Sequence, residues 1–116
     1  MKVSDVIRIV AEEKPHSFSD EKILSWINEV EAEVQEQLGV SPFIPAEDED
    51  SKLFAKTPYD RLYVSYVKAK VDYALEEYAS YENNQAQHIA DFRDFSSWVL
   101  RTSQAANRVT KIKGVY

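Results

Sequence analysis

The chain has 116 residues, no cysteine, two glycines and a formal net charge of −6. This length fits one domain with a single core, and the lack of cysteine excludes disulfides, thiolate nucleophiles and cysteine-ligated zinc. The acidic charge argues against general nucleic-acid binding by the domain as a whole. The first residues lack the apolar core of a signal peptide, and no apolar run approaches the roughly 20 residues of a membrane-spanning helix, so we expect no membrane partner.

The charge is distributed unevenly along the chain. Residues 1–60 hold 14 acids and 6 bases, a net of −8, whereas residues 61–116 hold 6 acids and 8 bases, a net of +2. After Asp94 the chain carries bases but no further acid. An acidic front and a basic end predict two surfaces with different roles.

Two amphipathic helices are predicted in the first 40 residues. Ser4 is a candidate cap for a short helix that ends near Glu13, shortly before Pro15. Ser19 is the candidate cap of a second helix, and Gly39 suits the left-handed position that closes it. The second helix has an apolar seam whose members alternate in steps of four and three: Ile23, Ile27, Val30, Val34 and Leu38.

A long connection is expected over residues 40–57. Pro42 and Pro45 break regular structure there, and the apolar pair Phe43 and Ile44 lies between them. A loop of this length in so small a domain is often functional. The acidic run 47–50 lacks the alternating ligands and the glycine of a calcium-binding loop, so we interpret it as solvated and expect no metal.

Two further helices are expected after this loop. Thr57 and Pro58 are typical of a helix start, and the third helix should run to about Tyr81. A last helix should run from about Gln85 to Leu100. The chain is therefore expected to be all-α, a small bundle of about four helices over residues 1–101. Residues 102–116 form an extended basic C-terminal tail in this interpretation.

No catalytic constellation is visible. His16 and His88 are the only histidines, and neither lies in a metal-binding or general-base motif. No nucleophile and base pair stands out either. We therefore expect a protein that is not an enzyme, with no catalytic residue, no metal and no cofactor.

Six tyrosines lie in or beside the third helix: Tyr59, Tyr63, Tyr66, Tyr73, Tyr78 and Tyr81. A base-stacking surface would interleave aromatic residues with basic ones, but four acids accompany three bases along this segment. Tyrosine rings can be buried while their hydroxyls reach water or polar partners. We therefore expect the tyrosines in the core or in a protein interface.

Four stretches together resemble the small head–tail connector (adaptor) proteins of tailed bacteriophages and related prophages. The resemblance covers about residues 18–101 and lies in the pattern of helices and aromatic positions, not in a catalytic signature. It leaves out the acidic run 47–50 and residues 102–116. The stretches are Phe18–Asn28, Pro58–Tyr73, Glu77–Asn84 and Phe92–Phe95.

The resemblance implies a structural role in the virion. Members of this family are small helical proteins that form a ring, of about twelve copies in the virion, below the portal protein. The ring extends the DNA channel, lets DNA pass without sequence-specific binding, and provides a platform for the stopper or head-completion protein. The implied location is the head–tail junction, and the bacterial cytoplasm before assembly. The protein is also expected to be able to remain a monomer in isolation and to form the ring only on the portal.

The resemblance also implies where the contacts lie. Similar proteins use a C-terminal segment to grip the portal, which here assigns portal contacts to Arg108, Lys111, Ile112, Lys113, Val115 and Tyr116. Phe43 and Ile44 are the second candidate contact, toward a neighbouring subunit or the next ring. The residues themselves leave one alternative open, a small helical regulator that binds nucleic acid through its basic tail.

Overall fold

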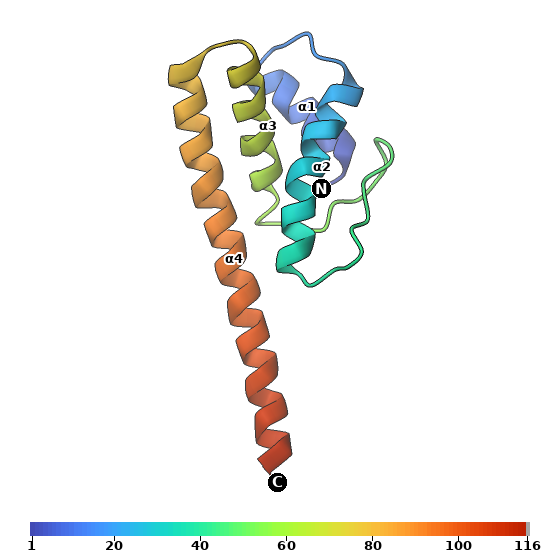
Figure 1. Cartoon of the computed structure of the whole chain (residues 1–116), viewed down its shortest axis with the longest axis vertical. Coiled ribbons are helices and arrows are strands. Elements are labelled where there is room, and N and C mark those ends of the chain that lie inside the picture. The colour runs from blue at the N-terminus through green and yellow to red at the C-terminus, as the bar shows by residue number, and fades with distance from the viewer. Residues whose placement is uncertain (116) are drawn as a thin grey trace.

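A computed structural model describes the backbone of residues 1–115 and the side chains of residues 1–103. Within residues 1–115 the chain forms four helices, α1 (Val3–Glu13), α2 (Asp20–Gln37), α3 (Arg61–Ala74) and α4 (Tyr78–Val115) (Figure 1). The described backbone contains no strand, only an isolated bridge between Lys2 and Lys52. The expected all-α fold class is confirmed.

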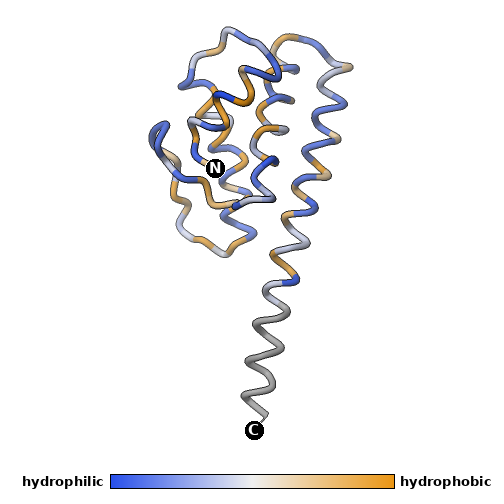
Figure 2. Tube along the Cα trace, turned by 180° about the vertical axis from the view of Figure 1, so that it is seen from behind, coloured by the Kyte–Doolittle hydropathy of each residue, from blue (hydrophilic) through white to orange (hydrophobic). Residues whose placement is uncertain are grey.

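Helix α3 is the centre of the bundle. It packs along α4 as an antiparallel hairpin, and α1 and α2 also pack against it (Figure 1). The buried apolar residues come from all four helices, and Figure 2 shows hydrophobic positions recurring along each of them. None of the helices, over the part of the chain that is described, is long and apolar enough to cross a membrane. The core residues with no exposed surface include Val6, Val10, Ile27, Val30, Val34, Leu62, Tyr63, Val67 and Phe95.

The first two helices match their expected positions, with one change of cap. The backbone N–H of Lys2 donates to the Asp5 carboxylate at 2.9 Å, so α1 begins before Ser4, which is not its cap. The hydroxyl of Ser19 accepts from the backbone N–H of Lys22 at 3.2 Å and caps α2, as expected. Gly39 has a φ of 74° after the end of α2, which confirms the left-handed position.

The third helix is shorter than the sequence predicts. The expected single helix to Tyr81 ends at Ala74, and Glu76 takes a φ of 59° in the turn that leads into α4. Asn84, which the sequence places between the third and the last helix, lies inside α4. Its side chain and that of Ser80 donate to the buried Asp72 carboxylate, so this polar segment fastens the turn instead of interrupting a helix.

Helix α4 extends at both ends beyond the expected range 85–100. It begins at Tyr78 and runs to Val115, so it includes most of the segment that the sequence sets apart as a tail. Leu100 is 59 % exposed and residues 101–103 are exposed, so α4 already stands clear of the other helices there. The division into a body over residues 1–101 and a tail over 102–116 stays a prediction.

Candidate protein-interaction surface

The tyrosines of the α3–α4 hairpin divide between the core and the surface. Tyr63 is fully buried, and Tyr59 is half-buried with its ring 5.5 Å from that of Trp98. Tyr73 and Tyr78 are 59 % and 53 % exposed, which is unusual for large rings. Their rings lie 5.9 Å apart, and tyrosine is among the residues enriched in protein interfaces.

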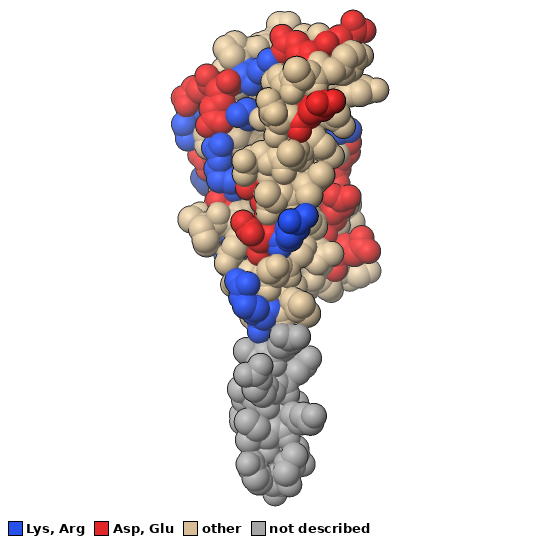
Figure 3. All heavy atoms as spheres, turned by 90° about the vertical axis from the view of Figure 1, so that its left-hand side faces the viewer, with Lys and Arg blue, Asp and Glu red and all other residues tan. Residues whose placement is uncertain are grey.

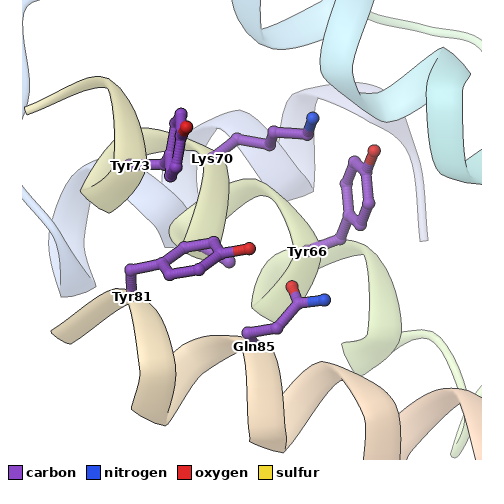
Figure 4. Close-up of a pocket in the computed structure, with 6 residues that line it drawn as sticks. Tyr66, Lys70, Tyr73, Tyr81 and Gln85 are labelled. Atoms are coloured by element: carbon purple, nitrogen blue, oxygen red, sulfur yellow. The ribbon is translucent and has the colours of Figure 1, made fainter. Parts of the chain in front are cut away.

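A groove of about 370 Å³ lies between α3 and α4, and we call it the tyrosine groove (Figure 4). Helix α3 supplies Tyr66, Lys70 and Tyr73, while α4 supplies Tyr81 and Gln85. The ring of Tyr73 packs edge-on against that of Tyr81, with 5.3 Å between the centroids. The lining is aromatic, with one amide and one ammonium as its polar groups besides the hydroxyls.

The charged groups of the tyrosine groove already have partners. The ammonium of Lys70 lies 3.1 Å from the Glu29 carboxylate and 5.5 Å from the centre of the Tyr66 ring. The Tyr66 hydroxyl donates to Glu29 at 2.8 Å. Burial and this carboxylate raise the pKa of Tyr66, so its hydroxyl remains a donor. A phosphate or carboxylate ligand would have to compete with Glu29 for Lys70.

A second groove of about 510 Å³ continues from the first, since the two share Tyr66 and Gln85. We call it the α2–α4 groove, because α2 and α4 form its walls. Ile89 is 49 % exposed there, beside the half-buried Phe92. The remaining lining residues are Glu33, Glu36, Gln37, His88 and Arg93.

His88 is a neutral part of this groove. Its Nδ1 lies 3.0 Å from the carbonyl oxygen of Leu62, to which the neutral ring donates, and its ring contacts those of Tyr66 and Phe92. Burial lowers the pKa of His88, so the imidazole is uncharged at neutral pH. His16 also has a hydrogen-bond partner, since its Nδ1 accepts from the backbone N–H of Phe18 at 3.0 Å.

The loop between α2 and α3 is fastened to α2 by two side-chain amides. Gln35 accepts from the backbone N–H of Ile44 at 2.8 Å and donates to its carbonyl at 2.7 Å. Asn28 makes the same pair of bonds to Ala46, at 2.8 and 3.0 Å. Each amide bonds both the N–H and the carbonyl of one loop residue, as the backbone of an adjacent β-strand would. These bonds hold the loop against α2.

Phe43 and Ile44 lie at the exposed part of this fastened loop. Their side chains are 41 % and 54 % exposed, although the backbone of Ile44 is bonded on both sides. We call these two residues the loop tip. The structure therefore presents the predicted contact residues as a fixed apolar projection.

The four residues of the acidic run 47–50 are exposed. Its own turn is closed by Ser51, whose hydroxyl accepts from the backbone N–H groups of Glu47 and Asp48. No group of three or more histidine, aspartate or glutamate side chains in the described residues is arranged to hold a metal ion. The predicted portal contacts Arg108, Lys111, Ile112, Lys113, Val115 and Tyr116 lie outside the described side chains.

Comparison of the chain with protein-family models, with curated proteins and with solved structures finds no match.

The two grooves and the amide fastening are the features that sequence reasoning missed. Asn28 and Gln35 are separated by seven residues on α2, so they lie on one face, and the buried Glu31 lies between them. Three polar residues at this spacing beside an apolar seam are the sequence signal that could have revealed a bonded loop. The grooves have no such signal, because residues from three helices form them.

Proposed function

We propose that this protein is a structural subunit of a bacteriophage head–tail connector ring. The ring binds below the portal, extends the DNA channel and provides a docking platform for the stopper or head-completion protein. The observation that carries the proposal is the presence of two different exposed surfaces on one small helical body, one apolar and one of mixed aromatic and polar lining. These are the loop tip and the joined grooves of the α3–α4 hairpin.

The two surfaces lie on different sides of the molecule. Gln35 of α2 holds the loop tip, whereas Glu33, Glu36 and Gln37 of α2 line the groove toward α4. The loop lies on one side of α2 and α4 on the other (Figures 1 and 2). A heterologous ring needs two complementary patches that face different neighbours. The sequence resemblance over residues 18–101 supports the same role.

The charge of the body is compatible with a channel through which DNA moves. Residues 1–103 carry 20 acids and 11 bases, a net of −9, because Arg108, Lys111 and Lys113 lie beyond them. Such a body repels DNA phosphates instead of retaining them. We assign no individual acid to the channel wall.

The contacts in the proposed ring follow the sequence interpretation. The basic C-terminal segment attaches to the portal through Arg108, Lys111, Ile112, Lys113, Val115 and Tyr116. The loop tip contacts a neighbouring subunit or the next ring. Before assembly the protein is in the bacterial cytoplasm, and afterwards at the head–tail junction.

The direct test is to mix the full chain with its cognate portal and to examine the particles by electron microscopy. We expect an added ring of density below the portal. A variant that lacks residues 104–116 loses the circular dichroism signal of that part of α4 but should keep a cooperative thermal unfolding transition, and it should lose most of the portal binding. Folded full-length protein that adds no density to the portal would contradict the proposal.

The nucleic-acid alternative makes a different prediction. If the basic tail binds DNA, each phosphate contact contributes about 0.9 to the slope of log affinity against log salt concentration. We expect no binding above low salt, because the −9 body opposes the tail. A slope of two or more, lost on removal of residues 104–116, would favour the regulator instead.

A further inference from the structure

We infer that a pocket with an acidic rim on one copy of the chain receives Leu100 and Arg101 from helix α4 of a second copy. The pocket lies between the N-terminal halves of α1 and α2 and the acidic run 47–50, and we call it the α1–α2 pocket. The inference rests on the proposed ring, in which copies lie side by side, and it names the surfaces that meet between neighbours.

The floor of the α1–α2 pocket is apolar. Val3 and Ile7 of α1 and Leu24 of α2 form it. Val3 is fully buried, whereas Ile7 and Leu24 are half-buried and still offer surface to a ligand. The pocket has a volume of about 200 Å³, which is below the roughly 300–1,000 Å³ of small-molecule sites. It therefore fits protein side chains and not a cofactor.

The rim of the pocket is acidic throughout. No lysine or arginine among the described residues lines it, and none of its five carboxylates has an ionic partner among them. Like charges this close together repel one another, and a cation placed between them relieves the repulsion. The rim residues are Asp20 and Glu21 at the start of α2 and Glu47, Asp48 and Glu49 in the loop.

Leu100 and Arg101 offer the complementary chemistry on α4. Leu100 exposes 59 % of its surface, and the adjoining Arg101 is exposed with no ionic partner among the described residues. Figure 3 views the molecule from the side of α4 and shows basic side chains on the lower half of this face. Both residues lie within a regular helix, so their backbone is already ordered and docking costs little conformational freedom.

The two surfaces match in both polarity and charge. The Leu100 side chain would cover the exposed parts of Ile7 and Leu24 and remove apolar surface of both copies from water. The guanidinium of Arg101 would lie among the rim carboxylates, as its five N–H donors and its permanent charge require. Opposite charges at the rim also favour one orientation of the two copies.

A copy cannot fill its own pocket. The pocket belongs to α1, α2 and the loop, whereas α4 packs along α3 and stands clear of the other helices at Leu100. Figure 1 shows α4 on one side of α3 and the loop on the other. The contact is therefore between different patches of two copies. Each copy retains one unfilled pocket and one free α4 segment, so the contact repeats and closes into a ring when the rotation permits.

The absence of native cysteine allows a direct crosslinking test. Glu47→Cys and Leu100→Cys are prepared as separate full-length variants with tags of different size. The mixed pair is oxidised mildly, with and without the portal, and the rate of mixed-dimer formation is measured. The control pair combines Leu100→Cys with Gln37→Cys, an exposed position roughly 20 Å along the axis of α2 from Leu24.

The acidic rim disfavours the thiolate at position 47, which alone would slow oxidation there. Each rate is therefore divided by the reactivity of the same thiol toward iodoacetamide. We expect the mixed dimer of the test pair to form at least tenfold faster than that of the control pair on the portal. Control-level rates both with and without the portal would overturn the inference. If either variant loses its cooperative thermal unfolding, the exposed pair Glu49→Cys and Ser103→Cys replaces it.

Charge reversal tests the part played by Arg101. Arg101→Glu in the Leu100→Cys variant should slow crosslinking severalfold, whereas Lys56→Glu, which reverses an exposed base outside both surfaces, should not. Glu49→Arg in the Glu47→Cys variant should restore the rate of the Arg101→Glu chain. Equal slowing by Arg101→Glu and Lys56→Glu, or an exchange of charges that restores nothing, would overturn the placement of Arg101 at the acidic rim.

Portal binding by the wild-type chain separates this inference from the proposed function. A ring on the portal together with control-level crosslinking would overturn the pocket assignment and leave the connector role in place. Rapid crosslinking with no binding to the portal would support the contact between copies and contradict the connector role. If both measurements are negative, both proposals fail.

Discussion

The hydroxyl of Tyr63 on α3 donates a 2.6 Å hydrogen bond to the carboxylate of Glu31 on α2, and both side chains are buried. The same hydroxyl accepts from the backbone N–H of Ala55 at 2.9 Å, and Glu31 accepts from that of Phe54 at 3.0 Å. One buried pair thus joins two helices to the end of the long loop.

Replacing Tyr63 by Phe should destabilise the protein by about 2 kcal/mol, because Glu31 and the N–H of Ala55 each lose a buried partner. Urea unfolding followed by circular dichroism measures the loss. The matched control is Tyr78→Phe, whose side chain is 53 % exposed, and it should change stability by less than about 0.5 kcal/mol. Equal stability of the two variants would show that the buried hydroxyl contributes nothing.

The Glu31 carboxyl should make stability depend on pH. Burial raises its pKa above the ordinary value of 4.5, and the bonds from Tyr63 and Phe54 only partly oppose this. The unfolded chain therefore ionises first as the pH rises, and the folded state loses stability.

The comparison is between the wild type and Glu31→Gln, unfolded in urea at a series of pH values from about 4 to about 8. The wild type should lose stability relative to Glu31→Gln as the pH rises above about 4.5. The exposed Glu36→Gln serves as the control for substitution alone. The raised pKa would be contradicted if the difference in unfolding free energy between the wild type and Glu31→Gln stayed constant with pH. It would also be contradicted if that difference grew in favour of the wild type as the pH rises.

Gln35→Ala should release the loop tip from α2. Two hydrogen bonds to Ile44 are lost, which we expect to cost about 2 kcal/mol and to open residues 40–46 to proteases. Limited chymotrypsin digestion, with Phe43 as the diagnostic site, measures the opening. The exposed Gln37→Ala is the matched control, and equal cleavage of the two variants would exclude a role for the amide bonds.

Asp72→Ala should be the most damaging single change at the α3–α4 turn. Its fully buried carboxylate lies 3.0 Å from the ammonium of Lys14 and accepts from Ser80 and Asn84. Removing it leaves Ser80 and Asn84 without their acceptor and Lys14 with Glu77 as its remaining partner, at a cost of about 3–5 kcal/mol. Thermal unfolding measures the loss, and the exposed Glu77→Gln should cost less than about 1 kcal/mol. A small effect at Asp72 would mean that the turn is held by packing alone.

Local sequence signals predicted both ends of α2, whereas the caps expected at Ser4 and Thr57 were wrong, since Lys2 precedes α1 and Asp60 precedes α3. Ser19 caps α2 because a hydroxyl next to free backbone N–H groups needs no tertiary partner. Gly39 closes α2 because it takes a positive φ without a steric penalty. The apolar seam of α2 identified its buried face, and Phe43 and Ile44 were recognised as an apolar pair in the loop.

Other features could not be predicted, because distant residues determine them. The boundary between α3 and α4 depends on Asp72, whose partners include Lys14 at the end of α1. The propensities of residues 75–81 are compatible with a continuing helix, and the buried Asp72 carboxylate holds the turn that interrupts it.

The fold class, the caps of α2 and the separation of an acidic front from a basic end follow from composition and from contacts within a few residues, so the order of amino acids is enough to specify them. Helix packing instead determines where the hairpin turns, that Gln35 holds Ile44, and that a continuous pair of grooves forms. The grooves are lined by Tyr66, Tyr73, Tyr81, His88 and Ile89 among others. These features require side chains from different helices to meet, and no local signal in the chain records which helices pack together.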